Sequence, residues 1–425
     1  MNMPRYRFSQ STCLTQWSEV RLLGLILMGA LVVRVAIVLY LDIVPVSDYA
    51  GYHNMAINLL SGRGLTDGES FAMLSAGYPL FVLVPIFAVF GDNLLAAQLG
   101  NALLGVLTTW LIYLIVREVG AGRIGRLVAP LIFAFYLPSW IYAEYLAKEN
   151  LMTPLMLGIV LLSVRCLRDA SVWVSLLLGV LIGLLAITGN AGLAILPVAF
   201  LALAMMPISL RGRGLRMGLV GLVAMLVIAP WLMRNDAVIG EPILNSNGGF
   251  NLYLGNNPAA NGFFVSIADT PRGATWPQLR EEGEVIASNT LKTEAIDWIK
   301  RNPSDFLALA VTKGRLFWMP PVHEGKGVQS RVEVMTRVAW LGQYLFICTL
   351  AIGSVAFVQL RTRKTGLLWL SIVGYTAVHM IFYVIFRYRE PVMPLMILLS
   401  ALTIEHLLTL RKTFPQVAPR RQIDV

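Results

Sequence analysis

The sequence predicts an all-α polytopic membrane protein, because its composition is too apolar for a soluble protein and its apolar residues form long blocks. Of its 425 residues, 57% are hydrophobic and only 14% are charged, whereas a soluble domain has about 25% charged residues. The apolar blocks run to about 18–22 residues, the length that a helix needs to cross a bilayer. This composition excludes a disordered chain, a collagen-like chain and a disulfide scaffold.

About ten of these blocks are expected to span the membrane as helices, the first of them uncleaved. They are 20–41, 94–116, 127–146, 149–165, 171–188, 191–207, 217–233, 338–360, 366–386 and 392–410. The apolar segment 77–90 has only 14 residues and contains two prolines, so an interfacial or re-entrant helix is expected there.

Basic residues predict how these helices are oriented. In the ten-helix arrangement, 18 Lys and Arg residues lie on the side that holds both termini, and four lie in the short loops on the other side. Cytoplasmic loops are enriched in basic residues, so both termini are expected to be cytoplasmic. The net charge of +10 then reflects topology, and no nucleic-acid partner is expected. We expect a multi-pass protein of the bacterial inner (plasma) membrane whose functional site faces the periplasm or the outside.

Two outer segments are too long to be simple turns. The segment 42–93 is acidic, and 234–337 has the ordinary polarity of a small lobe with mixed secondary structure. Within the lobe, 278–301 has helical spacing and is followed by Asn-Pro, a helix stop, whereas 240–277 is expected to form loops and turns. The expected parts are a membrane module at 1–233, the lobe at 234–337, and a second membrane module with a cytoplasmic tail at 338–425.

Asp48 begins a segment of helical spacing in the first outer loop, and two interpretations of it remain open. On a helix that ends at Gly62, Asp48 and Tyr52 share one face, and a carboxylate there could take a proton from a hydroxyl group. Alternatively, Asp48 only caps the helix, since Asp satisfies free N–H groups at a helix start. His53 lies off this face, so the spacing does not support an Asp–His pair.

Lys148 and Glu149 lie in the tight outer turn before the fourth expected span. A second carboxylate there could reach the same outer site as Asp48. The alternatives are a lysine that extends to the headgroup region and an acidic residue in the first turn of a helix.

Arg387 and Arg389 lie at the outer end of the ninth expected span, on the side where basic residues are few. Two guanidinium groups at this depth would suit a phosphate, through paired charge-assisted hydrogen bonds. The alternative is a pair of arginines that only reach the headgroups. Arg34, inside the first expected span, is costly unless it is paired or faces a polar cavity.

No other motif points to a chemistry. The sequence lacks the HExxH pattern, Cys/His ligand spacing, a Walker phosphate loop and GxSxG. Of the four histidines, His379 and His406 lie inside expected spans, where hydrogen bonding between helices is the expected role.

Six segments, in order along the chain, resemble the GT-C glycosyltransferase superfamily, in particular its protein-mannosyltransferase and aminoarabinose-transferase members. The resemblance covers about residues 20–405. The segments are the Asp48 loop with YHNMAINLLSGRGL, AGYPLFVLVPIFAVFG, ENLMTPL from Glu149, APWLMRN at 229–235, NSNGGFNLYLGNNPAANG at 245–262 and FRYREPVMP at 386–394.

The resemblance implies a GT-C fold and transfer of a sugar from a polyprenyl-phosphate donor to a protein, lipid or glycan acceptor outside the membrane, with inversion. It implies that Asp48 is the general base or a metal-associated carboxylate and Glu149 the second acidic residue. A divalent metal ion, if there is one, would be held by these two. Membrane lipids are the other expected partners. The implied substrate-binding residues are Tyr52, His53, Lys148, Arg234, Asn256, Asn257, Arg387 and Arg389.

The chain departs from the family pattern at two places. Where lipid A aminoarabinose transferases carry Lys-Pro-Pro-Leu, it has Gly-Tyr-Pro-Leu at 77–80, and where many relatives carry Arg-Pro it has Thr-Gly-Asn-Ala at 188–191. Both departures argue against a lipid A acceptor. They also leave phosphate binding to other basic residues.

A lipid-sugar flippase or transporter is the main alternative function, and it would place ionisable residues near the middle of the bilayer. Here the polar clusters gather at the outer boundary, which favours an enzyme. An O-antigen polymerase or ligase is a further alternative, and it is expected to rely on arginine and histidine in outer loops. The large outer segment contains one histidine, His323.

Overall fold

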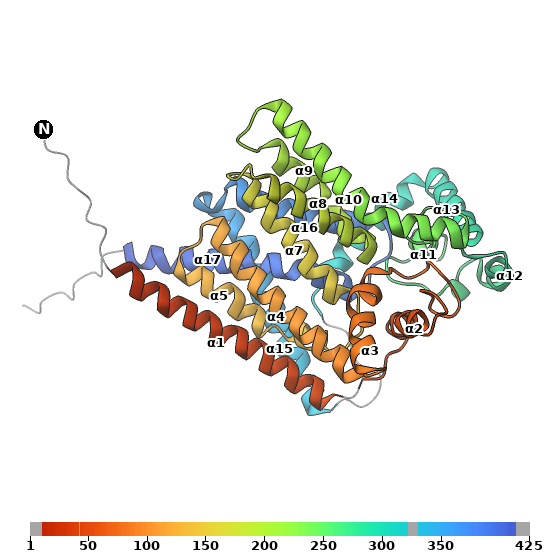
Figure 1. Ribbon diagram of the computed structural model, residues 1–425, viewed down its shortest axis with the longest axis horizontal. Helices are drawn as coiled ribbons and strands as arrows, with labels where there is room; N and C mark the ends of the chain where they lie inside the picture. Colours follow the sequence, from red (N-terminus) through yellow and green to blue (C-terminus); the bar gives the residue numbers. More distant parts are fainter. Residues whose placement is uncertain (1–10, 42, 322–329, 414–425) are drawn as a thin grey trace, which may run out of the picture.

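The computed structural model describes residues 11–41, 43–321 and 330–413, so His323 and the end of the expected cytoplasmic tail lie outside it. In the described part every regular element is a helix (Figure 1). One isolated β-bridge joins Phe263 and Val384. The prediction of an all-α chain is confirmed.

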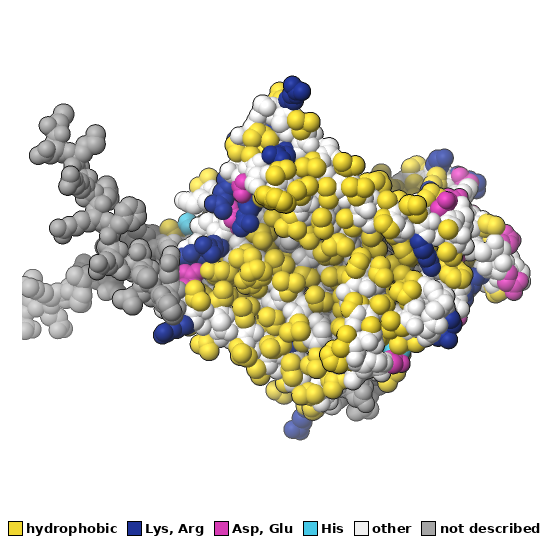
Figure 2. Space-filling view, in the orientation of Figure 1, with side chains coloured by type: hydrophobic (Ala, Val, Ile, Leu, Met, Phe, Trp, Pro, Cys, Tyr) yellow, Lys and Arg dark blue, Asp and Glu magenta, His cyan; other side chains and the backbone are white. Residues whose placement is uncertain are grey.

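The long apolar helices form one elongated bundle with α7 near its centre (Figure 1). In the apolar stretch of α7, 78% of the residues are buried, against 17% in α1 and in α10. The outer helices therefore expose apolar surface, and Figure 2 shows hydrophobic side chains over the middle of one face. The bundle consists of α1 (Ser11–Tyr40), α4 (Leu94–Val119), α5 (Arg123–Ala134), α7 (Glu149–Cys166), α8 (Val172–Thr188), α9 (Leu196–Ala204), α10 (Leu210–Ile239), α15 (Arg331–Ala356), α16 (Arg363–Ile381) and α17 (Met393–Thr413).

Six helices of the described residues are long and apolar enough to cross a membrane. Three shorter apolar helical segments accompany them: Pro79–Phe90, Val172–Thr188 and Asn190–Ala204. A multi-pass membrane protein is therefore confirmed, whereas the number of ten spans is not. The six are Ser18–Tyr40, Leu94–Val119, Glu149–Cys166, Leu210–Ile239, Arg331–Ala356 and Phe386–Leu410.

The expected span at 127–146 is wrong in its second half. Helix α5 ends at Ala134, and a short helix α6 (Leu137–Ile141) begins one residue before Pro138. Proline cannot donate the backbone hydrogen bond of a continuing helix, so the chain breaks here. Residues 142–148 then form the turn that leads into α7.

Two short helices form the segment that the sequence predicts to be interfacial or re-entrant. A π-helical turn η1 (Pro79–Leu83) continues into α3 (Val84–Phe90), and both have proline in their first turn. They pack against α4 and against α2 (Asp48–Leu60), the helix that carries Asp48.

The lobe beside the bundle is helical, so the expectation of mixed secondary structure is wrong for its described residues. It contains α11 (Asn247–Gly255), α12 (Trp276–Glu281), α13 (Glu284–Arg301) and α14 (Pro303–Phe317). The helix expected at 278–301 is confirmed from Glu284 onward, and the Asn-Pro stop separates it from α14. Its first residues belong to α12 instead, because the chain breaks at Gly283, whose φ is 108°. Helix α11 contradicts the expectation of loops over all of 240–277; it forms because Tyr253 and Leu254 pack on Leu291 and Ala295 of α13.

Buried charges bind the helices together at the end of the bundle away from the lobe (Figure 1). Glu118, 8% exposed, pairs with Arg165 and Arg168, and its carbonyl oxygen accepts from Lys364 at 2.6 Å. Loops that the sequence assigns to the basic side therefore meet at one end of the bundle.

Candidate functional site

A cleft of about 780 Å³, called here the large cleft, separates α2 and the 61–75 loop from the lobe helices α12 and α13. The cleft therefore lies between the two segments, 42–93 and 234–337, that the sequence predicts to be too long for simple turns. Its charged lining residues are Asp48, Asp67, Glu69, Arg280, Glu282 and Glu284.

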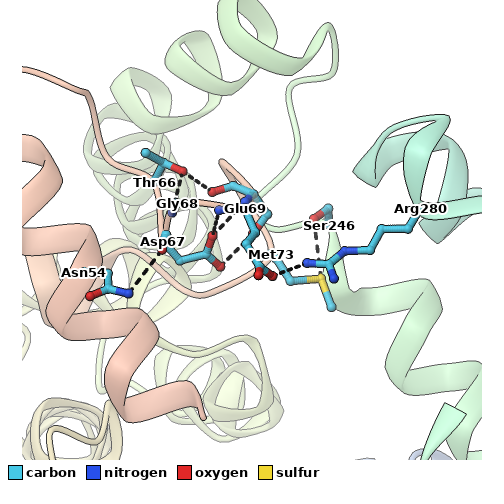
Figure 3. A network of polar contacts seen from close by, with 9 residues as sticks. Asn54, Thr66, Asp67, Gly68, Glu69, Met73, Ser246 and Arg280 are labelled. Atoms are coloured by element: carbon cyan, nitrogen blue, oxygen red, sulfur yellow. Dashed lines mark hydrogen bonds and ion pairs between the residues drawn. The ribbon is translucent and has the colours of Figure 1, made fainter. Parts of the chain in front are cut away.

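The 61–75 loop owes its shape to the side chain of Asp67 (Figure 3). Asp67 Oδ1 accepts from the amides of Glu69 at 2.9 Å and Ser70 at 2.7 Å, while the Ser70 hydroxyl donates to Oδ2 at 2.8 Å. The Thr66 hydroxyl donates to the Ser70 carbonyl at 2.6 Å. Such side-chain-to-backbone bonds fix a tight turn, so this wall of the large cleft is preformed.

Three charged residues attach this loop to the rest of the molecule. Arg234, at the end of α10, donates to the carbonyls of Leu65 at 2.6 Å and Phe71 at 2.8 Å. Glu284 accepts from the Phe71 amide at 3.2 Å, and Arg280 pairs with Glu69 (Figure 3). The structure thus places Arg234 as a clamp on the loop and not in the lining of the large cleft.

Asp48 is the first residue of α2 but does not cap it. The residue before the helix is Ser47, and neither side chain makes a capping hydrogen bond to the helix start. The Asp48 carboxylate pairs instead with Arg387, 339 residues later in the chain. The capping interpretation is therefore wrong, and Asp48 is a carboxylate at the edge of the large cleft.

Tyrosines surround Arg387 and orient it. Its Nη1 donates to the Tyr49 hydroxyl at 3.0 Å, and its guanidinium lies 5.4 Å from the Tyr49 ring centroid and 5.9 Å from that of Tyr388. The Tyr49 ring stacks on Tyr145 at 5.0 Å. Burial raises the pKa of the Tyr49 hydroxyl, and the nearby Arg387 offsets this only in part, so Tyr49 is a neutral hydrogen-bonding group.

Glu149 begins α7 and is 5% exposed. Its carboxylate interacts electrostatically with Arg387, as does that of Asp48. Asp48 therefore contacts Arg387 directly, and Glu149 acts on the same arginine through its charge. Glu149 and Lys148 both line a second cavity of about 240 Å³, called here the inner cavity. Glu149 also lines a small cavity of about 50 Å³ with Glu390.

Apart from Lys148 and Glu149, the inner cavity is lined by residues that the sequence analysis does not predict as site residues. Ser75 and three asparagines of the 245–251 stretch, Asn245, Asn247 and Asn251, form its polar part. The sequence pattern NSNGGFN contains these asparagines, whereas the family resemblance implies Asn256 and Asn257 as substrate-binding residues. Other lining residues are Met152, Asn190, Ala191, Gly248, Tyr375, Val378, His379, Phe382, Tyr383 and Tyr388.

Asn256 and Asn257 lie in the protein interior, 0% and 1% exposed. Asn256 donates to the Ile381 carbonyl at 2.8 Å and accepts from the Lys313 ammonium at 3.1 Å. Asn257 donates to the Tyr253 carbonyl at 2.8 Å. Neither lines the large cleft or the inner cavity. Asn256 joins the lobe to α16, and the hydrogen bonds of Asn257 stay within the lobe.

Arg389 points away from Arg387 into the protein. It is 0% exposed, its Nη1 donates to the Met319 carbonyl, and its guanidinium lies 4.4 Å from the Tyr344 ring centroid. Both arginines belong to the 3₁₀ turn η6 (Phe386–Val392). The structure therefore brings only one of the two predicted arginines to the site.

Neither Tyr52 nor His53 lines the large cleft or the inner cavity. Tyr52 is 2% exposed and packs edge-on against Tyr78, beneath α2. His53 Nε2 lies 2.6 Å from an Asp92 oxygen and its ring packs against Phe87. His53 therefore pairs with Asp92 and not with Asp48, as its position on the helix predicts.

The two departures from the family pattern contact each other. A Cβ atom added at Gly77 would lie 2.7 Å from the Cα of Thr188. Real Cβ atoms do not approach other atoms so closely, because packed interiors leave no such overlap. A side chain at 77 is thus excluded by the backbone at 188.

The Asp48 carboxylate pairs with the Arg387 guanidinium, so a divalent metal ion at Asp48 would have to displace this arginine. In the described residues, no group of three or more His, Cys, Asp or Glu is placed to bind a metal. We therefore assign the positive charge at the site to Arg387.

The chain is similar to proteins of one enzyme class. A family model described as dolichyl-phosphate-mannose-protein mannosyltransferase matches residues 78–233. No curated protein matches the chain in sequence.

Solved structures show the same fold. The archaeal oligosaccharyltransferase AglB from Archaeoglobus fulgidus, in complex with an inhibitory peptide and a dolichol-phosphate, has a TM-score of 0.53 at 12% identity, over 95% of this chain and 52% of that one. An oligosaccharyltransferase of Archaeoglobus fulgidus in the apo form has 0.50 at 14% identity, over 91% and 52%. ArnT from Cupriavidus metallidurans in the apo state has 0.45 at 15% identity, over 93% and 78%.

The chain spans about half the length of the two oligosaccharyltransferase chains. The match to their fold extends over nearly all of this chain, and the family match lies within it. Together they confirm the resemblance that the sequence predicts: the chain has the fold of the GT-C glycosyltransferases.

Proposed function

We propose that the protein transfers a sugar from a polyprenyl-phosphate donor to an acceptor that binds in the large cleft. One observation carries this proposal: the large cleft and the inner cavity both reach the cluster of Asp48, Arg387 and Glu149. Asp48 lines the large cleft, Glu149 lines the inner cavity, and Arg387 interacts with both residues. A group transfer between two bound molecules requires such neighbouring substrate spaces beside a base and a fixed cation.

The donor end of the site is the inner cavity. Lys148 lies at the start of α7, where the helix dipole and its free N–H groups favour an anion. Lys148 and Arg387 can therefore hold the phosphate of the donor, which leaves as polyprenyl phosphate. Stabilising the charge that develops on this leaving group is the main electrostatic task of such a site.

Asp48 is the proposed general base. Its carboxylate lines the large cleft, so it can accept the proton of an acceptor hydroxyl bound there. The acceptor oxygen then forms a bond to the anomeric carbon while the bond from that carbon to the phosphate oxygen breaks. The electron pair goes to the phosphate, the proton to Asp48, and direct displacement inverts the anomeric centre.

Glu149 is proposed to position Arg387. It is buried, whereas Asp48 has 40% of its side chain exposed, so Glu149 is the poorer acceptor for a proton that must return to solvent. Its negative charge attracts the Arg387 guanidinium.

The expected orientation follows from the charges. We propose that the lobe and both cavities face the periplasm or the outside, and that both termini and the basic loops are cytoplasmic in a bacterial inner membrane. A reporter fused after Arg123 should then read cytoplasmic and one at Asn257 outside. An outside signal at Arg123 would reverse the scheme.

Transfer itself is tested with the purified full chain and a labelled polyprenyl-phosphate sugar, incubated with membrane extract as the source of acceptors. The proposal expects label to move to an acceptor and polyprenyl phosphate to be released. Label that crosses a liposome bilayer while still attached to its carrier would indicate a flippase instead. A donor that is neither consumed nor translocated would refute the proposal.

A further inference from the structure

Two buried polar atoms of the inner cavity lack any hydrogen-bond partner in the described structure. They are Ser75 Oγ and Asn245 Oδ1, and Ser75 as a whole is only 2% exposed. Buried polar atoms in native proteins are almost always paired, and an unpaired one is costly. A ligand with hydroxyl groups would satisfy both atoms, since a hydroxyl donates and accepts.

A third polar residue of the inner cavity, Asn251, can make a further hydrogen bond. Asn251 Oδ1 accepts from the Tyr383 hydroxyl at 3.3 Å, which leaves its NH₂ group to donate. One cavity thus holds an amide oxygen, an amide NH₂ group and a serine hydroxyl. Together they can form hydrogen bonds to several hydroxyl groups of one ligand.

The inner cavity is also lined by aromatic rings, in addition to its polar groups. The ring centroids of Tyr375 and His379 are 4.5 Å apart, those of His379 and Tyr388 5.2 Å, and those of Tyr388 and Tyr383 5.9 Å. All four side chains line the inner cavity. A pyranose ring has an apolar C–H face that packs on aromatic rings and an edge of hydroxyl groups that needs polar partners.

The volume limits how much sugar can enter. A water molecule takes up about 30 Å³ in the liquid, so the 240 Å³ of the inner cavity correspond to about eight waters. One pyranose ring is of this scale, whereas an oligosaccharide is not.

Charge in the lining is confined to one end. Lys148 and Glu149 are neighbours at the start of α7, and the other polar groups named above are uncharged amides and hydroxyls. Away from Lys148 and Glu149, the lining offers no counter-charge to a charged group on the sugar, and burying an unpaired charge is costly. The lining therefore favours a sugar that carries no charge.

We propose that the inner cavity is a sugar subsite that accepts one uncharged pyranose, so that the donor carries a neutral monosaccharide and not an oligosaccharide. This inference rests on the proposed function, because it assumes that the sugar arrives on a polyprenyl phosphate. Asn245, Asn251 and Ser75 are its specificity-determining residues.

Binding to the full chain in detergent tests this without any need for transfer. The probes are polyprenyl phosphate alone and the same carrier with a neutral hexose, with a hexuronic acid, or, through a diphosphate, with an oligosaccharide. We expect the hexose donor to bind about ten-fold or more tighter than the bare carrier, and the two other donors to bind no tighter than the carrier.

Variants locate the gain in affinity. Asn245→Ala should weaken the hexose donor by about 3- to 10-fold, the value of one neutral hydrogen bond, and leave the bare carrier unchanged. Ala191→Phe, which fills the inner cavity, should remove the whole gain while the carrier still binds. The matched control is Asn289→Ala, an exposed asparagine of α13 that lines neither cavity, and it should change nothing.

Three results would overturn the inference: a hexose donor that binds no tighter than the bare carrier, an oligosaccharide donor that binds as tightly as the hexose donor, or full affinity of both variants. In each case the carrier still binds, so the proposed function stands. Failure of the bare carrier to bind would instead refute the proposed function and this inference with it. If the hexose donor binds more tightly than the bare carrier but no sugar is transferred, the proposed function alone is refuted.

Discussion

Replacing Asp48 with asparagine separates the chemical role of this residue from its structural one. The substitution keeps the size of the side chain and removes its charge and its ability to accept a proton. If Asp48 is the general base, turnover should fall by about 10²–10⁴. At about 1.4 kcal/mol per factor of ten, this is roughly 3–5 kcal/mol of transition-state stabilisation.

The structural cost of the same change is much smaller. Asp48 and Arg387 have 40% and 27% of their side chains exposed, and ion pairs in such surroundings contribute about 0–1 kcal/mol. Asp48 does not cap α2, so no helix cap is lost. The stability of the variant should therefore fall by at most about 1 kcal/mol, too little to account for the loss of activity.

The assay is turnover of a labelled polyprenyl-phosphate sugar in detergent, with thermal unfolding measured on the same preparation. Glu282→Gln is the control, since Glu282 is exposed, lines the same cleft and loses the same charge; it should keep full activity. An Asp48→Asn enzyme with more than a tenth of the wild-type rate would refute the base assignment. A variant whose only defect is weaker donor binding would show that Asp48 acts through Arg387.

Four further outcomes follow from the structure. Lys148→Ala should weaken binding of polyprenyl phosphate by about 10- to 100-fold, the value of a charged hydrogen bond, and unchanged binding would place the phosphate elsewhere. Arg389→Ala should destabilise the protein by about 3 kcal/mol, because the substitution removes a fully buried charged side chain and leaves the groups around it unpaired. The thermal unfolding temperature should therefore change more than the donor affinity. Lys313 has its pKa lowered to about 8 by burial; the unfolded chain binds the proton more tightly, so stability should rise with pH above 8. Between pH 8 and 10 the wild type should gain about 2 kcal/mol relative to Lys313→Met, and parallel curves would show that the lysine is not buried. Chelation by EDTA should leave the initial rate unchanged, because Arg387 supplies the charge at the site, and recovery of a lost rate by an added divalent ion would overturn that assignment.

Much of the site was predictable because helix spacing and topology leave few choices. Asp48, Glu149 and Arg387 each stand at the end of a helical segment, and the alternation of spans places those ends on one side. The position of the large cleft follows from the same argument, since the two long segments on that side must lie beside each other. Their contacts in the structure agree with this reasoning.

Which of two neighbouring residues faces the site was not predictable. Arg387 and Arg389 are two residues apart on a 3₁₀ turn, where each residue rotates by about 120°, so they point in different directions. The choice between them depends on Tyr344 and the Met319 carbonyl, which belong to other elements. The asparagines of 245–257 pose the same problem, because α11 turns some inward to the protein and others to the inner cavity.

The distance along the chain between the residues of the site has a consequence for biosynthesis. A ribosome releases Asp48 into the membrane long before Arg387, its partner 339 residues later. Until the segment that holds Arg387 is inserted, the Asp48 carboxylate has no guanidinium beside it. Under the proposed mechanism, a nascent or truncated chain lacks the cation that binds the donor phosphate, so no activated sugar is released from its carrier before synthesis is complete.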